Sequence, residues 1–441
     1  GGKQMMNSTG GSGPQSAAPA EPYSGSNYMP ALVVLTSLFL MWGLITSLTD
    51  ILIPHLKAIF TLSYLQASLI QFCFFGAYFV MSLPSGYLVE KLGYRLGIII
   101  GLSTAGVACL GFYPAASLQS YPLFLAALFV LASGITLLQV AANPYVSVLG
   151  PPTTAASRLN LTQAFNSLGT TAGPYLGSVF ILTVATGAAV DKAKEIATGQ
   201  GPYLILAGLL FAIAVLFAQF KLPVVKGTDA TTAAADDHNV PSVWKHSHLV
   251  LGAVAIFMYV GAEVAIGSYL VNLMAQPDVA GLEENVAGRY LSLYWGGAMV
   301  GRFIGAAVLR RVKPGQVLAF NATCVMALLI LAMSAAGPVA MWAVLAIGLF
   351  NSIMFPTIFT LGVARLGRHT GEGSGVLCMA IVGGAIIPVV QGYFADTAGL
   401  LVSFFVPAVC YAYIVFYGMK GHVVRSVPDA QISAESARSN M

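Results

Sequence analysis

Charged side chains are scarce in this sequence of 441 residues: they make up 8% of it, whereas hydrophobic residues make up 57%. Soluble domains usually carry about 25% charged residues. The composition therefore excludes an ordinary soluble globular protein and predicts one that lies in a membrane.

Motifs for catalysis and metal binding are also missing. The five cysteines show no C-x-x-C spacing, so we expect small packing residues rather than disulfides or metal ligands. No His-Glu-x-x-His or Gly-x-Ser-x-Gly motif is present, and we expect no enzyme. A cleavable signal peptide is not expected either, because the first apolar run lies too far into the chain and is too long.

Apolar runs of about 20 residues recur along the chain and predict membrane-spanning helices. A transmembrane barrel would instead alternate every second residue. We predict an all-α membrane protein with twelve spans: 30–55, 65–88, 95–114, 121–149, 158–186, 201–220, 248–275, 287–309, 315–335, 338–364, 373–396 and 398–420.

Basic residues in the loops predict the orientation. The loops after even-numbered spans carry most of them: Lys91, Arg95, Arg158, Lys221, Lys226, Lys245, Arg310, Arg311, Lys313, Arg365 and Arg368. The other loops carry only Lys57, Lys192, Lys194 and Arg289. By the positive-inside rule both termini are cytoplasmic. The net charge of +4 thus reflects topology, and no nucleic-acid partner is expected.

The chain divides into two similar halves. The segment 221–247 is polar and lacks apolar periodicity, so we interpret it as a cytoplasmic linker. It separates six-helix bundles at 29–220 and 248–420, between tails 1–28 and 421–441 that are too polar to order. Gln139-Val-Ala-Ala-Asn-Pro144 aligns with Asn351-Ser-Ile-Met-Phe-Pro356, 212 residues later. We infer two pseudo-symmetric repeats with a substrate site where they meet.

Two helical features accompany this repeat. Pro144 and Pro356 each lack a backbone donor and can bend their spans beside amide side chains. Glycines at 169, 173 and 177 and at 297, 301 and 305 put small residues on one face of two spans. These glycines permit either static packing or a sliding contact between the halves.

A charged loop carries the first family resemblance. Gly86-Tyr-Leu-Val-Glu90-Lys91-Leu-Gly93-Tyr-Arg95 resembles the loop signature of the major facilitator superfamily. Gly301-Arg302 and Arg310-Arg311 resemble a degenerate second copy. We expect Glu90, Lys91, Arg95 and Arg302 to form gating loops that hold one conformation.

A second set of residues is similar to the branch of L-fucose permeases and bacterial glucose/galactose transporters. It comprises Trp42, Asp50, the stretch Gln139–Tyr145, Arg158–Ser167 and Tyr259–Glu263. The resemblance covers about 30–420 and implies sugar–cation symport by alternating access. The fucose-permease pattern has a carboxylate where this chain has Gln139. An amide does not titrate, so a proton relay from this position is unavailable.

A sugar needs amides for its hydroxyl groups and an aromatic plate for its ring. Gln139 and Asn143 are four residues apart on one helical face, and Gln163 and Asn166 are three apart on another. Amides can also join neighbouring helices, so a structural role stays open. The predicted sugar-binding residues are Trp42, Gln139, Asn143, Gln163, Asn166, Tyr294, Trp295 and Asn351.

Carboxylates inside apolar spans are candidates for cation coupling. A charge at the centre of a bilayer costs about 2.5–3.5 kcal/mol on insertion scales, so it is retained for a function. Asp50 can accept a proton, or it can bind Na⁺ together with the hydroxyls of Ser47 and Thr49. Glu263 is the second candidate, with a structural ion pair as the alternative.

We therefore predict a monomeric importer of a glucose- or galactose-like hexose in a bacterial cytoplasmic membrane. Its partners are the sugar, Na⁺ or H⁺ as the co-transported cation, and the lipid bilayer, with no resident cofactor. The alternatives are a drug–proton antiporter on the same fold, or a symporter for L-fucose, mannose or N-acetylglucosamine. A sugar receptor would normally carry a soluble signalling domain.

Replacing Asp50 with asparagine tests the coupling role. We expect gradient-driven sugar accumulation in membrane vesicles to fall to background, because the amide can neither bind a proton nor compensate a cation. Counterflow exchange of labelled sugar should persist. Intact accumulation by D50N would remove Asp50 from the coupling step.

Overall fold

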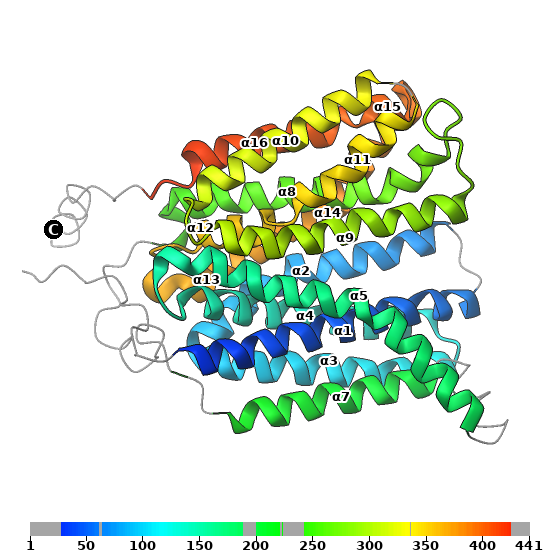
Figure 1. The fold of residues 1–441 in the computed structure, drawn as a ribbon. Coiled ribbons are helices and arrows are strands. Elements are labelled where there is room, and N and C mark those ends of the chain that lie inside the picture. The colour runs from blue at the N-terminus through cyan, green and yellow to red at the C-terminus, as the bar shows by residue number, and fades with distance from the viewer. Residues whose placement is uncertain are drawn as a thin grey trace, which may run out of the picture.

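The computed structural model describes residues 28–60, 64–187, 200–220, 223, 242–335 and 337–424. Within these ranges every regular element is a helix. The helices run roughly alongside one another in a long bundle (Figure 1). The side chains of residues 45, 48–60, 64–68, 174–187, 200–202, 284 and 285 lie outside the described part, as do most of the predicted linker and both predicted tails.

The elements assemble into the twelve predicted spans. The first six are α1 (Met29–Phe60), α2 (Tyr64–Leu92), α3 (Tyr94–Ser117), α4 (Tyr121–Val148), α5 (Ala155–Gly187) and α7 (Gln200–Gln219). The next three are α8 (Ser247–Ala275), α9 (Glu284–Val308) and α10 (Pro314–Ser334). The last three are broken: α11 (Pro338–Asn351) with α12 (Met354–Gly362); α13 (Thr370–Met379), η4 (Ala380–Val382) and α14 (Gly383–Ala398); and α15 (Leu400–Ser403), α16 (Phe405–Phe416) and η5 (Tyr417–Gly421).

Helix length and composition agree with a membrane protein. In the described part, eight helices are long and apolar enough to cross a bilayer. Short 3₁₀ turns lie outside these elements at η1 (Pro152–Thr154), η2 (Val243–Lys245) and η3 (Gly367–His369). The start of α1 and the end of η5 lie at the same end of the bundle (Figure 1), as an even number of spans requires.

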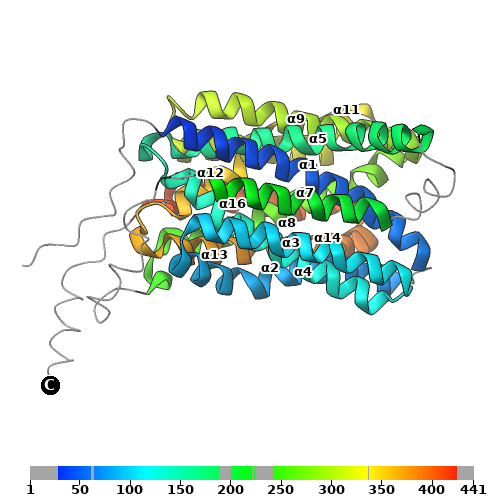
Figure 2. The same cartoon turned by 90° about the horizontal axis from the view of Figure 1, so that it is seen from below.

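The spans pack as two groups. In the N-terminal half α3 packs on α4 and α7, while α1 packs on α5; in the C-terminal half α8 packs on α14 and α16, and α9 packs on α11. Figure 1 shows the two groups side by side, and they overlap in Figure 2, which is seen from below. They meet where α2 contacts α13 and where α5 contacts α9 and α12. The prediction of an all-α, twelve-span fold is confirmed.

The glycine faces pack within each half. Gly169 and Gly173 of α5 face the backbone of α1, where an added Cβ would collide with the Leu40 carbonyl or with Ser47. Gly301 and Gly305 of α9 face Ser352 and Ile353 at the break between α11 and α12. In both spans the described glycines pack helices of the same bundle against one another. This favours static packing over a sliding contact between the halves.

The bundle is closed at the end that holds Tyr28 and η5. Ser157 Oγ of α5 donates to the carbonyl oxygen of Ala306 in α9 at 2.6 Å, and Asn160 Nδ2 of α5 donates to Thr357 Oγ1 of α12 at 3.2 Å. Asn160 and Thr357 are both fully buried. At this end α2 and α13 approach so closely at Gly86 and Gly371 that a Cβ on either would press on the other's backbone.

Two glycines on α9 allow a matched test of the close packing. G301A should lower the free energy of unfolding by about 1–3 kcal/mol, because the methyl group overlaps Leu349 and Ser352. G296A should leave stability unchanged or raise it by up to about 1 kcal/mol, since nothing lies within 4 Å of its Cβ position. Thermal unfolding of both purified variants measures the difference. Equal effects would contradict the packing described.

Candidate functional site

Pro144 sets the local structure of α4. Proline has no backbone N–H, so the carbonyl oxygen four residues earlier, that of Val140, loses its helical partner. Ser374 of α13 fills the vacancy: its Oγ donates to the Val140 oxygen at 2.9 Å, and the Ser374 side chain is fully buried. A donor from the C-terminal half therefore satisfies a carbonyl in the N-terminal half.

Pro356 has the corresponding effect in the second half. It frees the carbonyl oxygen of Ser352, in the two-residue break between α11 and α12. Arg302 Nε of α9 donates to this oxygen at 3.1 Å, and Arg302 Nη1 donates to Ser167 Oγ of α5. Arg302 lies inside α9, six residues and roughly 9 Å before its end. It thus lies within the helix and inside the predicted span 287–309, before the loop that holds Arg310 and Arg311.

A tyrosine cluster surrounds Asn351 at the end of α11. Asn351 Nδ2 donates to Tyr294 Oη at 2.8 Å, and Tyr411 Oη donates to Asn351 Oδ1 at 2.7 Å. Tyr259 Oη lies 2.8 Å from Glu263 Oε1 and 3.0 Å from the Asn351 carbonyl oxygen. Asn351, Tyr294 and Tyr411 are fully buried. The two ends of the Asn351 amide therefore both have partners in its own half.

The amides of the N-terminal half are less completely paired. Gln163 Nε2 of α5 donates to Asn143 Oδ1 of α4 at 3.1 Å. Gln139 Nε2 donates to Tyr78 Oη of α2 at 2.7 Å. Asn143 Nδ2 is buried and has no hydrogen-bond partner in the described part of the chain. A buried N–H donor without an acceptor lowers the stability of the fold, unless a ligand or a water molecule accepts its hydrogen bond.

A chain of polar contacts joins the two amide clusters. Ser167 Oγ donates to the carbonyl oxygen of Gln163 at 3.0 Å, and it also accepts the hydrogen bond from Arg302. Arg302 continues the chain to Ser352, the neighbour of Asn351. The predicted residues Gln163, Asn143, Asn351 and Arg302 are thus connected across the interface between the halves.

Three predicted sugar-binding residues lie apart from these contacts. Trp42 packs on Phe39, with ring centroids 5.4 Å apart, and borders a void of about 20 Å³ among α1, α3, α4 and α7. Asn166 Nδ2 donates to the Phe39 carbonyl oxygen at 3.0 Å and so joins α5 to α1. Trp295 is 47% exposed, whereas the adjacent Tyr294 is fully buried.

The cation-coupling candidates are only partly described. Ser47 is buried against Gly173 of α5. Asp50 and Thr49 belong to α1, but their side chains lie outside the described residues. Glu263 accepts its hydrogen bond from Tyr259.

The charged loop lies at the closed end. Glu90 and Lys91 are in the last turn of α2, and the Lys91 ammonium lies 4.4 Å from the centre of the Tyr87 ring. Glu90 Oε1 is 3.7 Å from His369 Nδ1 in the other half. Arg95, in the first turn of α3, donates to the Ala218 carbonyl oxygen in α7. The loop therefore contacts both its own bundle and the opposite one.

Sequence reasoning missed four partners: Tyr78, Tyr411, Ser167 and Ser374. Apolar patterning gives no signal for a tyrosine or serine inside a uniformly apolar helix. For Ser374 one signal existed, because Pro144 leaves the Val140 carbonyl without its helical donor and so indicates that another helix must supply one.

Comparisons with known proteins agree with this geometry. The profile described as Major Facilitator Superfamily matches residues 34–387. The chain belongs to this superfamily. It is 56% identical over 401 residues to a glucose/galactose transporter of Brucella abortus, a match that covers 91% of this chain and 96% of the relative. It is 34% identical to an L-fucose-proton symporter of Escherichia coli, over 89% of this chain and 93% of the relative.

A solved structure of this superfamily is also similar. A major facilitator superfamily transporter, FucP, in the outward conformation has a TM-score of 0.81 and 34% identity, covering 89% of this chain and 98% of that one. The resemblance drawn from the loop and amide motifs is confirmed at the level of the superfamily, the fold and the similarity to these two kinds of transporter.

Replacing Arg302 tests the contact between the halves. R302Q removes charged hydrogen bonds worth about 1.5–3 kcal/mol each, so the closed end should open more often. A cysteine placed at the buried Ala306, in a background without the native cysteines, reports this opening. We expect R302Q to raise the rate of maleimide labelling by at least about tenfold.

R289Q is the matched control, because Arg289 is an exposed arginine near the other end of α9. It should leave labelling of the cysteine at 306 unchanged. Equal labelling in R302Q and R289Q would mean that Arg302 does not hold the closed end.

Proposed function

We propose that this protein imports a glucose- or galactose-like hexose by symport with Na⁺ or H⁺, through alternating access between the two halves. One observation carries the proposal: a chain of polar contacts through Ser167 and Arg302 spans the interface between two six-helix bundles, beside the amides Asn143, Gln163 and Asn351. The names of the relatives that cover nine-tenths of the chain support a sugar as the substrate. No enzymatic role is proposed.

The sugar site that we propose lies between Asn143 with Gln163 in one half and Asn351 in the other. Gln139 lies one helical turn from Asn143 on the same face of α4. The unpartnered Asn143 Nδ2 supports a ligand here, because a sugar hydroxyl would accept its hydrogen. Tyr294 belongs to the Asn351 cluster. Trp42, Asn166 and Trp295 are proposed to contribute after a rearrangement.

The proposed coupling group is Asp50, with Ser47 and Thr49 beside it and Glu263 in the opposite half. A charged carboxylate among apolar side chains is energetically costly, and binding of a cation removes this cost. Reorientation is therefore expected only when both sugar and cation are bound. Glu90, Lys91, Arg95 and Arg302 are proposed to hold the closed end until that occurs.

The closed end is proposed to be the cytoplasmic one. The excess of loop lysines and arginines at this end supports that orientation, with both termini inside. The described conformation would then receive sugar from outside a bacterial inner membrane. We propose that one chain suffices for transport.

Uptake of radiolabelled sugar into proteoliposomes tests the proposal. A Na⁺ gradient and an H⁺ gradient are imposed in separate experiments at matched membrane potential. Glucose and galactose should accumulate with one of the two gradients. The gradient that drives uptake identifies the ion. Absence of accumulation with both gradients, in protein that unfolds cooperatively on heating, would refute cation-coupled sugar import.

A pair of variants separates the sugar site from general damage. N143L should weaken sugar binding by at least about tenfold, because it removes amide hydrogen bonds in a buried site. N321L serves as the control, since among the described residues Asn321 of α10 donates its side-chain hydrogen bond to the Val317 carbonyl of its own turn, at 2.8 Å. Equal sugar affinity in the two variants would place the sugar elsewhere.

A further inference from the structure

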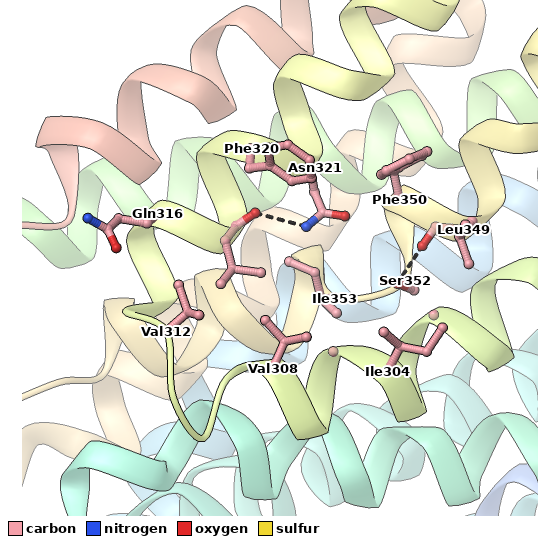
Figure 3. A pocket seen from close by; sticks show the side chains of 13 residues that line it. Ile304, Val308, Val312, Gln316, Phe320, Asn321, Leu349, Phe350, Ser352 and Ile353 are labelled. Atoms are coloured by element: carbon pink, nitrogen blue, oxygen red, sulfur yellow. Dashed lines mark hydrogen bonds between the residues drawn. The ribbon is translucent and has the colours of Figure 1, made fainter.

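A groove opens on the C-terminal half, beside the polar chain described above. It has a volume of about 420 Å³, within the range of about 300–1,000 Å³ typical of small-molecule sites. Figure 3 shows it running from Val312 and Gln316, at the α9–α10 connection, to Ser352 and Ile353 at the break between α11 and α12.

The groove lies on the outer surface of the bundle. Its wall helix α10 packs on α11, α12, α15 and α16, all in its own half. Phe320 of α10 is 63% exposed and Ile304 of α9 is 54% exposed, and both line the groove. Since these helices span the membrane, this apolar face borders the acyl chains of the bilayer.

Basic side chains crowd one mouth of the groove. Arg310, Arg311 and Lys313 surround the lining residue Val312, and all three are exposed. Within the described residues they form no ion pair. The sequence holds no aspartate or glutamate between Glu284 and Glu372, so no acidic side chain from α10, α11 or α12 neutralises this mouth.

We propose that the groove binds an anionic phospholipid. One acyl chain lies between Ile304, Val308 and Phe320, and the phosphate group lies against Arg310, Arg311 and Lys313. Basic pockets between transmembrane helices bind anionic head groups in this way. The lipid comes from the leaflet at the closed end of the bundle, which is the cytoplasmic leaflet in the orientation proposed above. The site itself does not depend on which sugar is carried.

The floor of the groove connects the site to the closed conformation. Ser352 lines the groove, and its carbonyl oxygen holds Arg302, which reaches Ser167 in the other half. A lipid packed here contacts the break between α11 and α12 and keeps the Ser352 carbonyl where Arg302 can donate to it. It therefore favours the closed end.

Thermal unfolding of delipidated, detergent-purified full-length protein tests the site. Phosphatidylglycerol should raise the apparent Tm of the wild-type chain, whereas phosphatidylcholine of the same acyl composition and inorganic phosphate should not. The triple variant R310Q/R311Q/K313Q should bind phosphatidylglycerol at least about tenfold more weakly by native mass spectrometry. R310K/R311K, which keeps the charge, should retain binding.

The apolar part of the site has its own pair of variants. V308W fills the groove and should abolish stabilisation by phosphatidylglycerol. V339W makes the same change at an exposed position near the other end of the bundle and should retain it. Equal stabilisation by phosphatidylcholine or by phosphate alone would overturn the proposal, as would normal lipid binding in both the triple variant and V308W.

Discussion

A backbone carbonyl inside a membrane needs a donor, because lipid supplies none. Pro144 and Pro356 each take a donor away, and the fold restores it with Ser374 and Arg302. These two replacements lie where the bundles meet, beside the amides Asn143 and Asn351. Each proline therefore places a carbonyl that needs a donor from another helix beside the candidate sugar site.

The two replacements are not equivalent. Ser374 belongs to the half opposite Val140, so the Val140 carbonyl is satisfied only while the halves touch at α4 and α13. Arg302 belongs to the same half as Ser352 and extends to Ser167 across the interface. When the halves separate at this end, the Val140 carbonyl loses its donor and needs water instead. The Ser352 carbonyl keeps its hydrogen bond from Arg302. The free energy of opening therefore includes the loss of the hydrogen bond between Ser374 and Val140, but not that of the bond between Arg302 and Ser352.

Much of this architecture could be predicted from sequence, and for identifiable reasons. Run length predicts the twelve spans, and the repeat around Asn143-Pro144 and Asn351 indicates which helices carry the proposed site. The partners could not be predicted, since apolar helices give no periodicity from which to orient Tyr78, Tyr411 or Ser167. The Gly-Arg pair grouped Arg302 with the gating residues, but apolar patterning gives no signal for its two acceptors, Ser352 and Ser167.

The tyrosines around Asn351 have a further consequence. Tyr294 and Tyr411 bond both ends of the Asn351 amide and so fix its orientation. The Asn143 amide nitrogen, in contrast, has no acceptor among the described residues. Discrimination between sugars that differ in one hydroxyl would then reside mainly in α4 and α5. In the proposed sugar site, substitutions in the N-terminal bundle alone would therefore change which sugar is preferred, while the C-terminal bundle keeps its sequence.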